Sequence, residues 1–170
     1  TILLASLAFP STFPTFSNFS QLLLNLSIDS IVAVGMMLLL ITGTFDLSVG
    51  SVVAFVGCLA AYLMQFFGVP VALAIVLAMS AGVIVGGLNG YLIAYVGINP
   101  MIQTLAMMGI VRGLALLVSG AGIQSLPYCF NAIGQSKLLD IQTPVWYMVF
   151  IVCLFTFLLR WPLLHLLISS

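Results

Sequence analysis

Two apolar runs, residues 21–41 and 47–67, are separated only by a short segment that contains Gly43 and the carboxylate of Asp46. Together they exceed the roughly 20 residues that cross a hydrocarbon core about 30 Å thick, so the chain must break between them. A carboxylate in such surroundings costs free energy unless it lies at a membrane face or has a partner. The pattern predicts a membrane protein whose helix is broken at Asp46.

The chain has too few charges to cover a water-facing surface. Charged residues make up 4% of its 170 residues and hydrophobic residues 64%, whereas a soluble domain carries about 25% charged residues. The formal net charge is zero, so no basic surface for nucleic acid is expected. Three widely spaced cysteines indicate neither a disulfide framework nor a metal site, and Cys58 and Cys153 are predicted to be packing residues.

The predicted fold is all-α: a polytopic transmembrane helical bundle of about five full spans plus a partial first span, with broken-helix junctions. The partial span is residues 1–9, and the full spans are residues 21–41, 47–67, 71–88, 100–118 and 144–159. Residues 89–99 form a connector, and residues 119–143 form the one long polar loop. Glycines spaced four residues apart, at Gly82, Gly86 and Gly90 and at Gly109 and Gly113, predict close helix packing.

Few cations are available to set the orientation. Arg160 at the end of the last span favours the cytoplasm for that end. Counting back through alternating spans places Asp46 and the connector 89–99 on the cytoplasmic side, and Pro70 and Lys137 outside.

Polar residues at the breaks are the candidate functional residues. Asp46 and Ser48 are predicted to organise the broken junction, where Asp46 either caps the following helix or has a direct functional role. Asn99 before Pro100 is a predicted N-cap. Asn89, Asn99 and Gln103 are candidates for a solute pathway or for structural polar contacts.

Arg112 lies well inside a predicted span, where an arginine costs about 2.5–3.5 kcal/mol and needs a partner or a watery cavity. A structural ion pair, or a bond to the carbonyls of a broken helix, is favoured over contact with a solute. Asp29 is the one other charge deep in the apolar sequence, so an Asp29–Arg112 pair is a testable hypothesis.

Signals of soluble enzymes are absent from the sequence. There is no Gly-x-x-x-x-Gly-Lys-Ser/Thr phosphate loop, so the chain itself is not expected to hydrolyse ATP in that manner. The single histidine, His165, belongs to no metal-ligand cluster. Asp29 and Asp46 leave open an intramembrane aspartyl protease in principle, but Asp46 lacks the motifs of that class. No catalytic residue, metal or cofactor is predicted.

Several ordered motifs resemble one transporter family. Gly43-Thr44-Phe45-Asp46-Leu47-Ser48-Val49-Gly50-Ser51 resembles the Gly-Gly-Ile-Asp-Leu-Ser-Val-Gly-Ser motif of ribose-type (monosaccharide) ABC importer permeases. Asn89-Gly90-Tyr91-Leu92-Ile93-Ala94 and Gly97-Ile98-Asn99-Pro100-Met101-Ile102-Gln103-Thr104-Leu105 resemble its connector and next span entry, continued by Ile110 to Ala115 and by Pro144-Val145-Trp146. The similarity covers roughly residues 13–159.

This resemblance implies the membrane-spanning permease subunit of an ATP-driven importer for a small neutral sugar or related polyol. The implied partners are a cytoplasmic ABC ATPase that binds the ATP, a periplasmic or extracellular sugar-binding protein, a second permease subunit and the lipid bilayer. The implied location is the bacterial inner membrane, with several crossings.

The chain departs from the family pattern at Thr44 and Phe45, and again after Arg160, where residues 161–170 do not resemble the basic segment that contacts the ATPase. We therefore expect residues 1–170 to be a single transmembrane permease domain that forms the N-terminal half of a longer chain. The alternatives are a branched-chain amino-acid-type ABC permease and a truncated, non-transporting membrane fragment.

Overall fold

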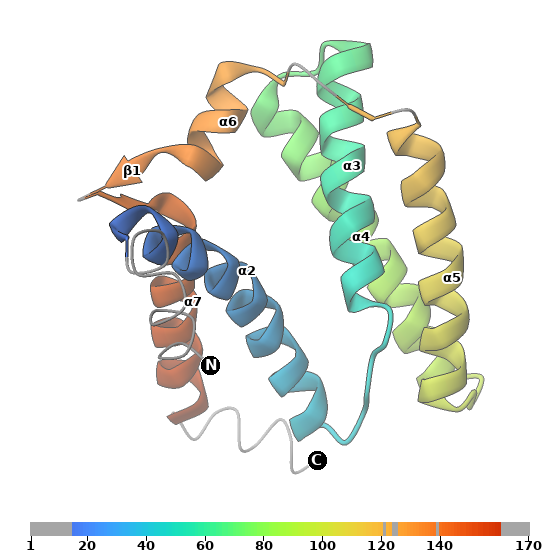
Figure 1. Ribbon diagram of the computed structural model, residues 1–170. Coiled ribbons are helices and arrows are strands. Elements are labelled where there is room, and N and C mark those ends of the chain that lie inside the picture. Colours follow the sequence, from blue (N-terminus) through green and yellow to red (C-terminus); the bar gives the residue numbers. More distant parts are fainter. Residues whose placement is uncertain (1–14, 121, 124–125, 139, 161–170) are drawn as a thin grey trace, which may run out of the picture. The chain divides into compact units, whose positions relative to one another are not determined.

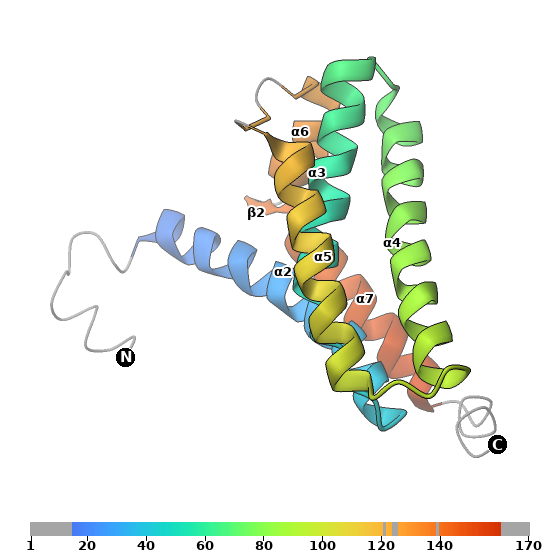
Figure 2. The ribbon, with the colours of Figure 1, turned by 90° about the vertical axis from the view of Figure 1, so that its right-hand side faces the viewer.

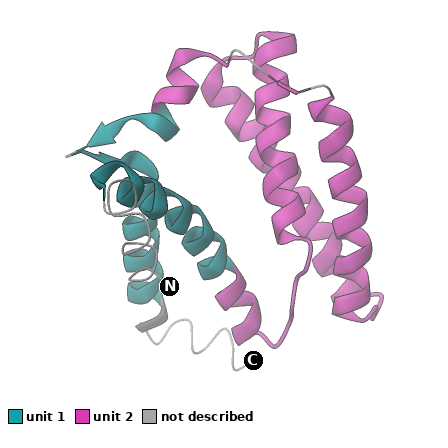
Figure 3. Ribbon diagram, viewed as in Figure 1, with its two compact units in different colours: residues 1–35, 133–170 teal, residues 36–132 magenta. Residues whose placement is uncertain are grey.

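The computed structural model describes residues 15–120, 122–123, 126–138 and 140–160, without the side chains of residues 159 and 160. In this part the element order is α2, α3, α4, α5, α6, β1, β2 and α7 (Figure 1). The chain divides into two compact units, unit 1 with residues 1–35 and 133–170 and unit 2 with residues 36–132 (Figure 3). Helix α2 (Phe16–Ile41) begins in unit 1 and ends in unit 2.

Unit 2 is built around α3 (Val49–Phe67), which packs against both α4 (Val71–Ala94) and α5 (Pro100–Ser119) (Figure 2). The buried core between α3 and α4 consists of small side chains and one methionine: Ala60, Met64, Ala74 and Ala78. Phe130, from the first turn of α6 (Tyr128–Gln135), packs against this cluster. Alanine at the contact lets two backbones approach closely, which is how helices associate in lipid.

Two glycines end helices in unit 2. Gly43 follows α2 with φ 76°, and its N–H donates to the carbonyl of Leu40 at 3.0 Å. Gly68 follows α3 with φ 62°, and the N–H of Val69 donates to the carbonyl of Leu63 at 3.2 Å. Glycine reaches this left-handed region without steric cost, so the last carbonyls of each helix gain donors within the chain.

The helices of unit 2 expose large apolar side chains. Val83 on α4 is 74% exposed and Leu117 on α5 is 79% exposed. Helices α2, α3, α4 and α5 are each long and apolar enough to cross a membrane, judged by length and composition. These faces suit a hydrocarbon solvent, and the chain is a multi-pass membrane protein.

Unit 1 contains most of α2, the end of α6, a hairpin whose two strands have two residues each, and α7 (Thr143–Arg160). Strands β1 (Lys137–Leu138) and β2 (Ile141–Gln142) pair antiparallel, with Lys137 opposite Gln142. The hairpin is tied to the start of α7, because the N–H of Thr143 donates to the carbonyl of Ser136 at 2.9 Å. Trp146 Nε1 donates to the carbonyl of Leu138 at 3.3 Å.

The all-α class is confirmed, and four of the predicted full spans correspond to α2, α3, α4 and α5. The fifth corresponds to α7, whose apolar stretch Thr143–Leu158 is shorter. Helix α2 begins at Phe16, before the predicted start at residue 21, and two other assignments were wrong. Helix α4 continues to Ala94, so Asn89 belongs to the helix and not to the connector, and the predicted loop 119–143 contains α6 and the hairpin. Residues 1–14 and 161–170, with the predicted partial span and His165, lie outside the described residues, as does the side chain of Arg160.

The glycine spacing predicted close packing along α4 and α5, but only Gly82 has that role in the described structure. A Cβ placed on Gly82 would lie 2.9 Å from Cγ2 of Val56 on α3. At Gly86, Gly90, Gly109 and Gly113 an added Cβ meets no atom within 4 Å. The close approach of α3 and α4 therefore depends on one glycine of the five.

We expect Gly82→Ala to destabilise the chain relative to Gly86→Ala. Alanine favours a helix over glycine by about 1 kcal/mol at either position, but at Gly82 the new methyl must displace a stiff β-branched side chain, which costs about 1–3 kcal/mol. Thermal unfolding of the two purified variants in the same detergent, followed by circular dichroism, measures the difference. A Gly82→Ala variant as stable as Gly86→Ala would contradict the close approach.

Candidate functional site

The break between α2 and α3 is organised by Asp46. Its Oδ1 accepts a hydrogen bond from the backbone N–H of Ser48 at 2.7 Å and another from the Ser48 hydroxyl at 2.6 Å. Ser48 is the N-cap residue of α3 and is fully buried, and its side chain does not cap the helix. Asp46 therefore closes the turn that leads into α3 and does not cap the first helical N–H groups, so its predicted role as the cap of this helix was wrong.

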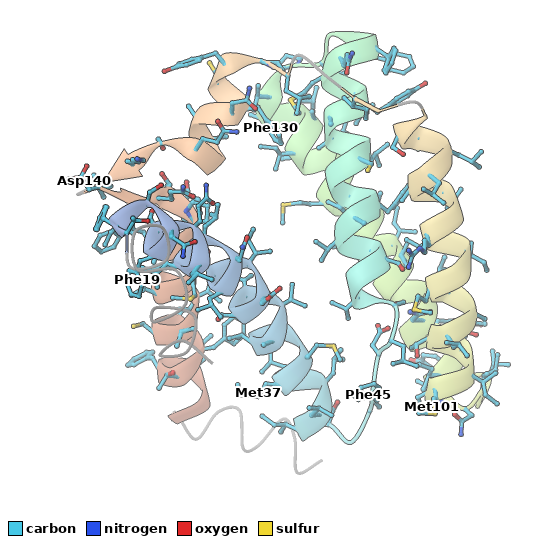
Figure 4. All side chains as sticks on the ribbon, viewed as in Figure 1. Phe19, Met37, Phe45, Met101, Phe130 and Asp140 are labelled. Atoms are coloured by element: carbon cyan, nitrogen blue, oxygen red, sulfur yellow. The ribbon has the colours of Figure 1, made fainter. Side chains whose placement is uncertain are left out.

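The turn is connected to α4 and α5 by two amide side chains. Asn89 Nδ2 donates to the Ser48 hydroxyl oxygen at 3.1 Å, across 41 positions of sequence. Gln103 Nε2 donates to Asn89 Oδ1 at 3.2 Å. We call Asp46, Ser48, Asn89 and Gln103 the junction chain. Figure 4 shows the neighbouring labelled side chains Phe45 and Met101 near this same end of unit 2.

The direction of these hydrogen bonds follows from Asp46. A serine hydroxyl has a single proton, and the proton of Ser48 is directed to the carboxylate at 2.6 Å. Ser48 can then only accept from Asn89, so Asn89 must present its NH₂ group there and its carbonyl to Gln103. Every donor thus points toward the carboxylate, which is the arrangement in which successive hydrogen bonds strengthen one another.

Burial increases the contribution of the junction chain to stability. Ser48 and Asn89 are 0% and 3% exposed, in a segment surrounded by apolar helices. A hydrogen bond to a charged group contributes about 1.5–3 kcal/mol, and leaving a buried polar partner unpaired costs about 1–3 kcal/mol. The junction chain joins the start of α3 to α4 and α5, so its loss is expected to loosen all three.

Asn99 acts separately, as the N-cap of α5. Its Oδ1 accepts from the N–H of Met101 at 2.9 Å and from that of Ile102 at 3.4 Å, and Pro100 occupies the first helical position. The predicted cap is confirmed.

The hydrogen bonds between Ser48, Asn89 and Gln103 also place the break at Asp46 and the segment around Asn99 at one end of unit 2, as the count of spans predicted.

A groove of about 480 Å³ runs between α3 and α5 within unit 2. We call it the α3–α5 groove. Its polar lining consists of Ser51 and Cys58 from α3 and Arg112 and Ser119 from α5, and the rest is glycine, alanine, leucine and methionine. Arg112 is exposed and Cys58 is half-buried. Ser51 lies seven residues before Cys58 on α3, and Ser119 lies seven residues after Arg112 on α5. The two residues of each pair therefore lie on one face of their helix.

The candidate residues thus separate into three groups. Asp46, Ser48, Asn89 and Gln103 meet in the junction chain, Asn99 caps α5 nearby, and Arg112 lies in the α3–α5 groove. Asp29 belongs to unit 1, so its pairing with Arg112 stays a prediction.

Sequence analysis did not assign the groove residues Ser51, Cys58 and Ser119. The seven-residue spacing would have placed Ser119 with Arg112 on one face of α5, but their meeting with Ser51 and Cys58 depends on tertiary packing. Cys58 is half-buried and lines the groove, and Cys153 is exposed, so their predicted role in packing stays a prediction. In the described part of the chain, no three His, Cys, Asp or Glu side chains gather as a metal ion requires.

Residues 18–164 match the family described as branched-chain amino acid transport system / permease component. An L-arabinose ABC transporter permease protein of Azospirillum brasilense is 39% identical over 153 residues, covering 87% of this chain and 44% of the relative. A ribose import permease protein of Escherichia coli K12 is 32% identical over 158 residues, covering 90% and 47%.

An autoinducer 2 import system permease protein of Yersinia enterocolitica is 34% identical over 142 residues, covering 79% of this chain and 41% of the relative. The chain spans about half the length of these relatives. No solved structure matches it.

We expect Asn89 and Gln103 to be energetically coupled. In a double-mutant cycle of Asn89→Ala and Gln103→Ala, the coupling should be about 0.5–1.5 kcal/mol, as for other side-chain hydrogen bonds between membrane helices. Unfolding of the four proteins in mixed micelles measures it. The control pair is Asn89→Ala with Ser80→Ala, because Ser80 is exposed and its hydroxyl donates only to the carbonyl of Val76 within its own helix. Equal coupling in both cycles would contradict the junction chain.

Proposed function

Because the chain belongs to the family of permease components of the branched-chain amino acid transport type, we propose that it is a membrane-spanning permease subunit of an ATP-driven ABC importer for a small neutral sugar or related polyol. The observation that carries this proposal is the identity of 32–39% to permeases named for ribose and L-arabinose over most of this chain. The relatives are named as transport permeases, and no enzyme activity is part of the proposal.

In this proposal the helices form part of the translocation path and do no covalent chemistry. ATP is bound by a separate cytoplasmic ATPase, a sugar-binding protein delivers the solute, and a second permease subunit completes the path in the bacterial inner membrane. Solute would move when ATP-driven closure of the ATPases tilts the permease subunits. The junction chain supports a mechanical role for Asp46. A helix break can pass a tilting motion from one helix to the next only if the geometry of the break is fixed.

A branched-chain amino acid is the second candidate solute, and the description of the matched family favours it. Such a solute carries an ammonium and a carboxylate, and both charges need partners in a dry path. Asp46 is the single acid among residues 36–132, and its Oδ1 accepts two hydrogen bonds from Ser48. The scarcity of anionic partners favours a neutral solute.

Uptake of radiolabelled sugars tests the proposal, in cells that carry the full gene with its neighbouring ATPase and binding protein. We expect uptake of one sugar that excess branched-chain amino acid does not compete away. Uptake of the amino acid instead, or no ATP-dependent uptake of any sugar, would contradict the proposed function; the latter result would favour a non-transporting fragment.

The same assay tests the junction. At equal membrane abundance, Asp46→Ala should lower uptake about tenfold or more, because both hydrogen bonds of Ser48 lose their charged acceptor. Asp46→Asn, which keeps an Oδ1 acceptor, should retain more uptake than Asp46→Ala. The matched control for the loss of charge is Asp140→Asn, at the exposed turn of the hairpin, because asparagine also tolerates the φ of 62° at this position. Normal uptake with Asp46→Ala would show that the junction is dispensable for transport.

A further inference from the structure

Arg112 forms no ion pair with an acid in the described part of its own unit. Asp46 is the only acid among residues 36–132, and it lies at the end of unit 2 where Gln103 joins the junction chain. Arg112 comes nine residues after Gln103 on α5, which is about 13 Å along a helix. Leu47, next to Asp46 in the sequence, lines the same groove as Arg112, but Oδ1 of Asp46 accepts two hydrogen bonds from Ser48. No ion pair joins Arg112 to this carboxylate in the described part of unit 2.

A guanidinium in the middle of a span is costly unless water or a polar ligand surrounds it. Arg112 is exposed, and it lines the α3–α5 groove together with Ser51, Cys58 and Ser119. The position in the groove explains how the charge is tolerated, because a groove that admits water and polar solute can solvate it. A lipid-filled groove would leave it without partners.

We propose that the α3–α5 groove is a contact site for the transported polyol, with Arg112 as a specificity-determining residue. This inference rests on the proposed function and adds to it the place where the solute is held. It also assigns Arg112 the role of solute contact, which the sequence alone did not favour.

The lining suits a neutral molecule with many hydroxyl groups. A guanidinium presents five N–H donors in a planar fork, and each serine hydroxyl both donates and accepts. Sugar hydroxyls can accept from Arg112 and exchange hydrogen bonds with Ser51 and Ser119. The apolar side chains between them suit the C–H faces of a sugar ring. The described lining contains no carboxylate for an ammonium group, so an amino acid would leave its positive charge unpaired.

The size of the groove agrees with such a ligand. Its volume of about 480 Å³ falls in the range of about 300–1,000 Å³ that is usual for small-molecule sites. The groove also contains a residue whose reaction rate reports on access to it, because Cys58 lies on its α3 side. Cys129 and Cys153 are both exposed outside the groove and can be replaced by serine to leave Cys58 alone.

The experiment measures how fast Cys58 reacts in the assembled transporter, with its ATPase and binding protein, in membrane vesicles. The Cys129→Ser/Cys153→Ser variant is treated with a charged, water-soluble methanethiosulfonate, and the modified fraction is followed by mass spectrometry. We expect the reagent to reach Cys58. The transported sugar, at ten times its dissociation constant, should slow the reaction about tenfold, because only about a tenth of the sites stay empty. The mirror-image sugar should have no effect.

Two variants assign the effect to Arg112. With Arg112→Gln, Cys58 should still react, but the sugar concentration that protects it should rise about tenfold or more, because a charged hydrogen-bond donor is lost. Arg112→Lys, which keeps the charge, should need less sugar than Arg112→Gln. The control reporter is Ser80→Cys in a protein with all three natural cysteines replaced, since Ser80 is exposed on α4 outside the groove. Its reaction rate should not depend on the sugar.

Four results would overturn the inference. Reaction of Cys58 with a lipid-soluble maleimide but not with the charged reagent would show a lipid-facing groove. Reaction with neither would show a groove covered by protein, as an Asp29–Arg112 pair predicts. Equal rates with and without sugar, in vesicles that still take up that sugar, would reject the site and leave the proposed function intact. Equal protection in the wild-type and Arg112→Gln backgrounds would reject the role of Arg112.

Discussion

The hydrogen bond from the Ser48 hydroxyl to Asp46 is the interaction on which the other contacts of the junction depend. It uses the single proton of Ser48 at 2.6 Å, so Asn89 must donate to Ser48 and Gln103 must donate to Asn89. One carboxylate thereby orients polar side chains on α4 and α5 and closes the turn that begins α3. Burying an acid at an apolar helix break costs desolvation free energy. The hydrogen bonds that connect α3, α4 and α5 through this carboxylate offset that cost.

The rest of unit 2 follows from the hydrocarbon solvent. Backbone groups at each helix end need partners within the chain, and Gly43, Gly68 and Asn99 provide them through turns and a cap. Packing relies on close contact of small residues, as at Gly82 against Val56. Large apolar side chains are left exposed on the outer faces of the helices, which suit a hydrocarbon solvent.

Sequence patterns predicted much of this fold because the membrane restricts it so strongly. Apolar run lengths gave the spans, and Asn99 before Pro100 gave a cap that the structure confirms. Asn89 was misplaced because an amide after an apolar run is typical of a loop; its burial against Ser48 overrides that preference. The junction chain could not be predicted, because Asp46, Asn89 and Gln103 meet only through tertiary packing. The groove at Arg112 was missed for the same reason.

The most direct test of the account is a chemical cross-link between α4 and the start of α3. In a protein whose natural cysteines are replaced by serine, a short bis-methanethiosulfonate should join Ser48→Cys to Asn89→Cys, because Asn89 Nδ2 and the Ser48 hydroxyl oxygen are 3.1 Å apart in the native pair. The reagent should not join Ser48→Cys to Ser80→Cys, nine residues earlier on α4. Cross-linking of the first pair alone, seen after proteolysis in the turn at Gly68, would support the account. Cross-linking of the second pair, or of neither, would contradict it.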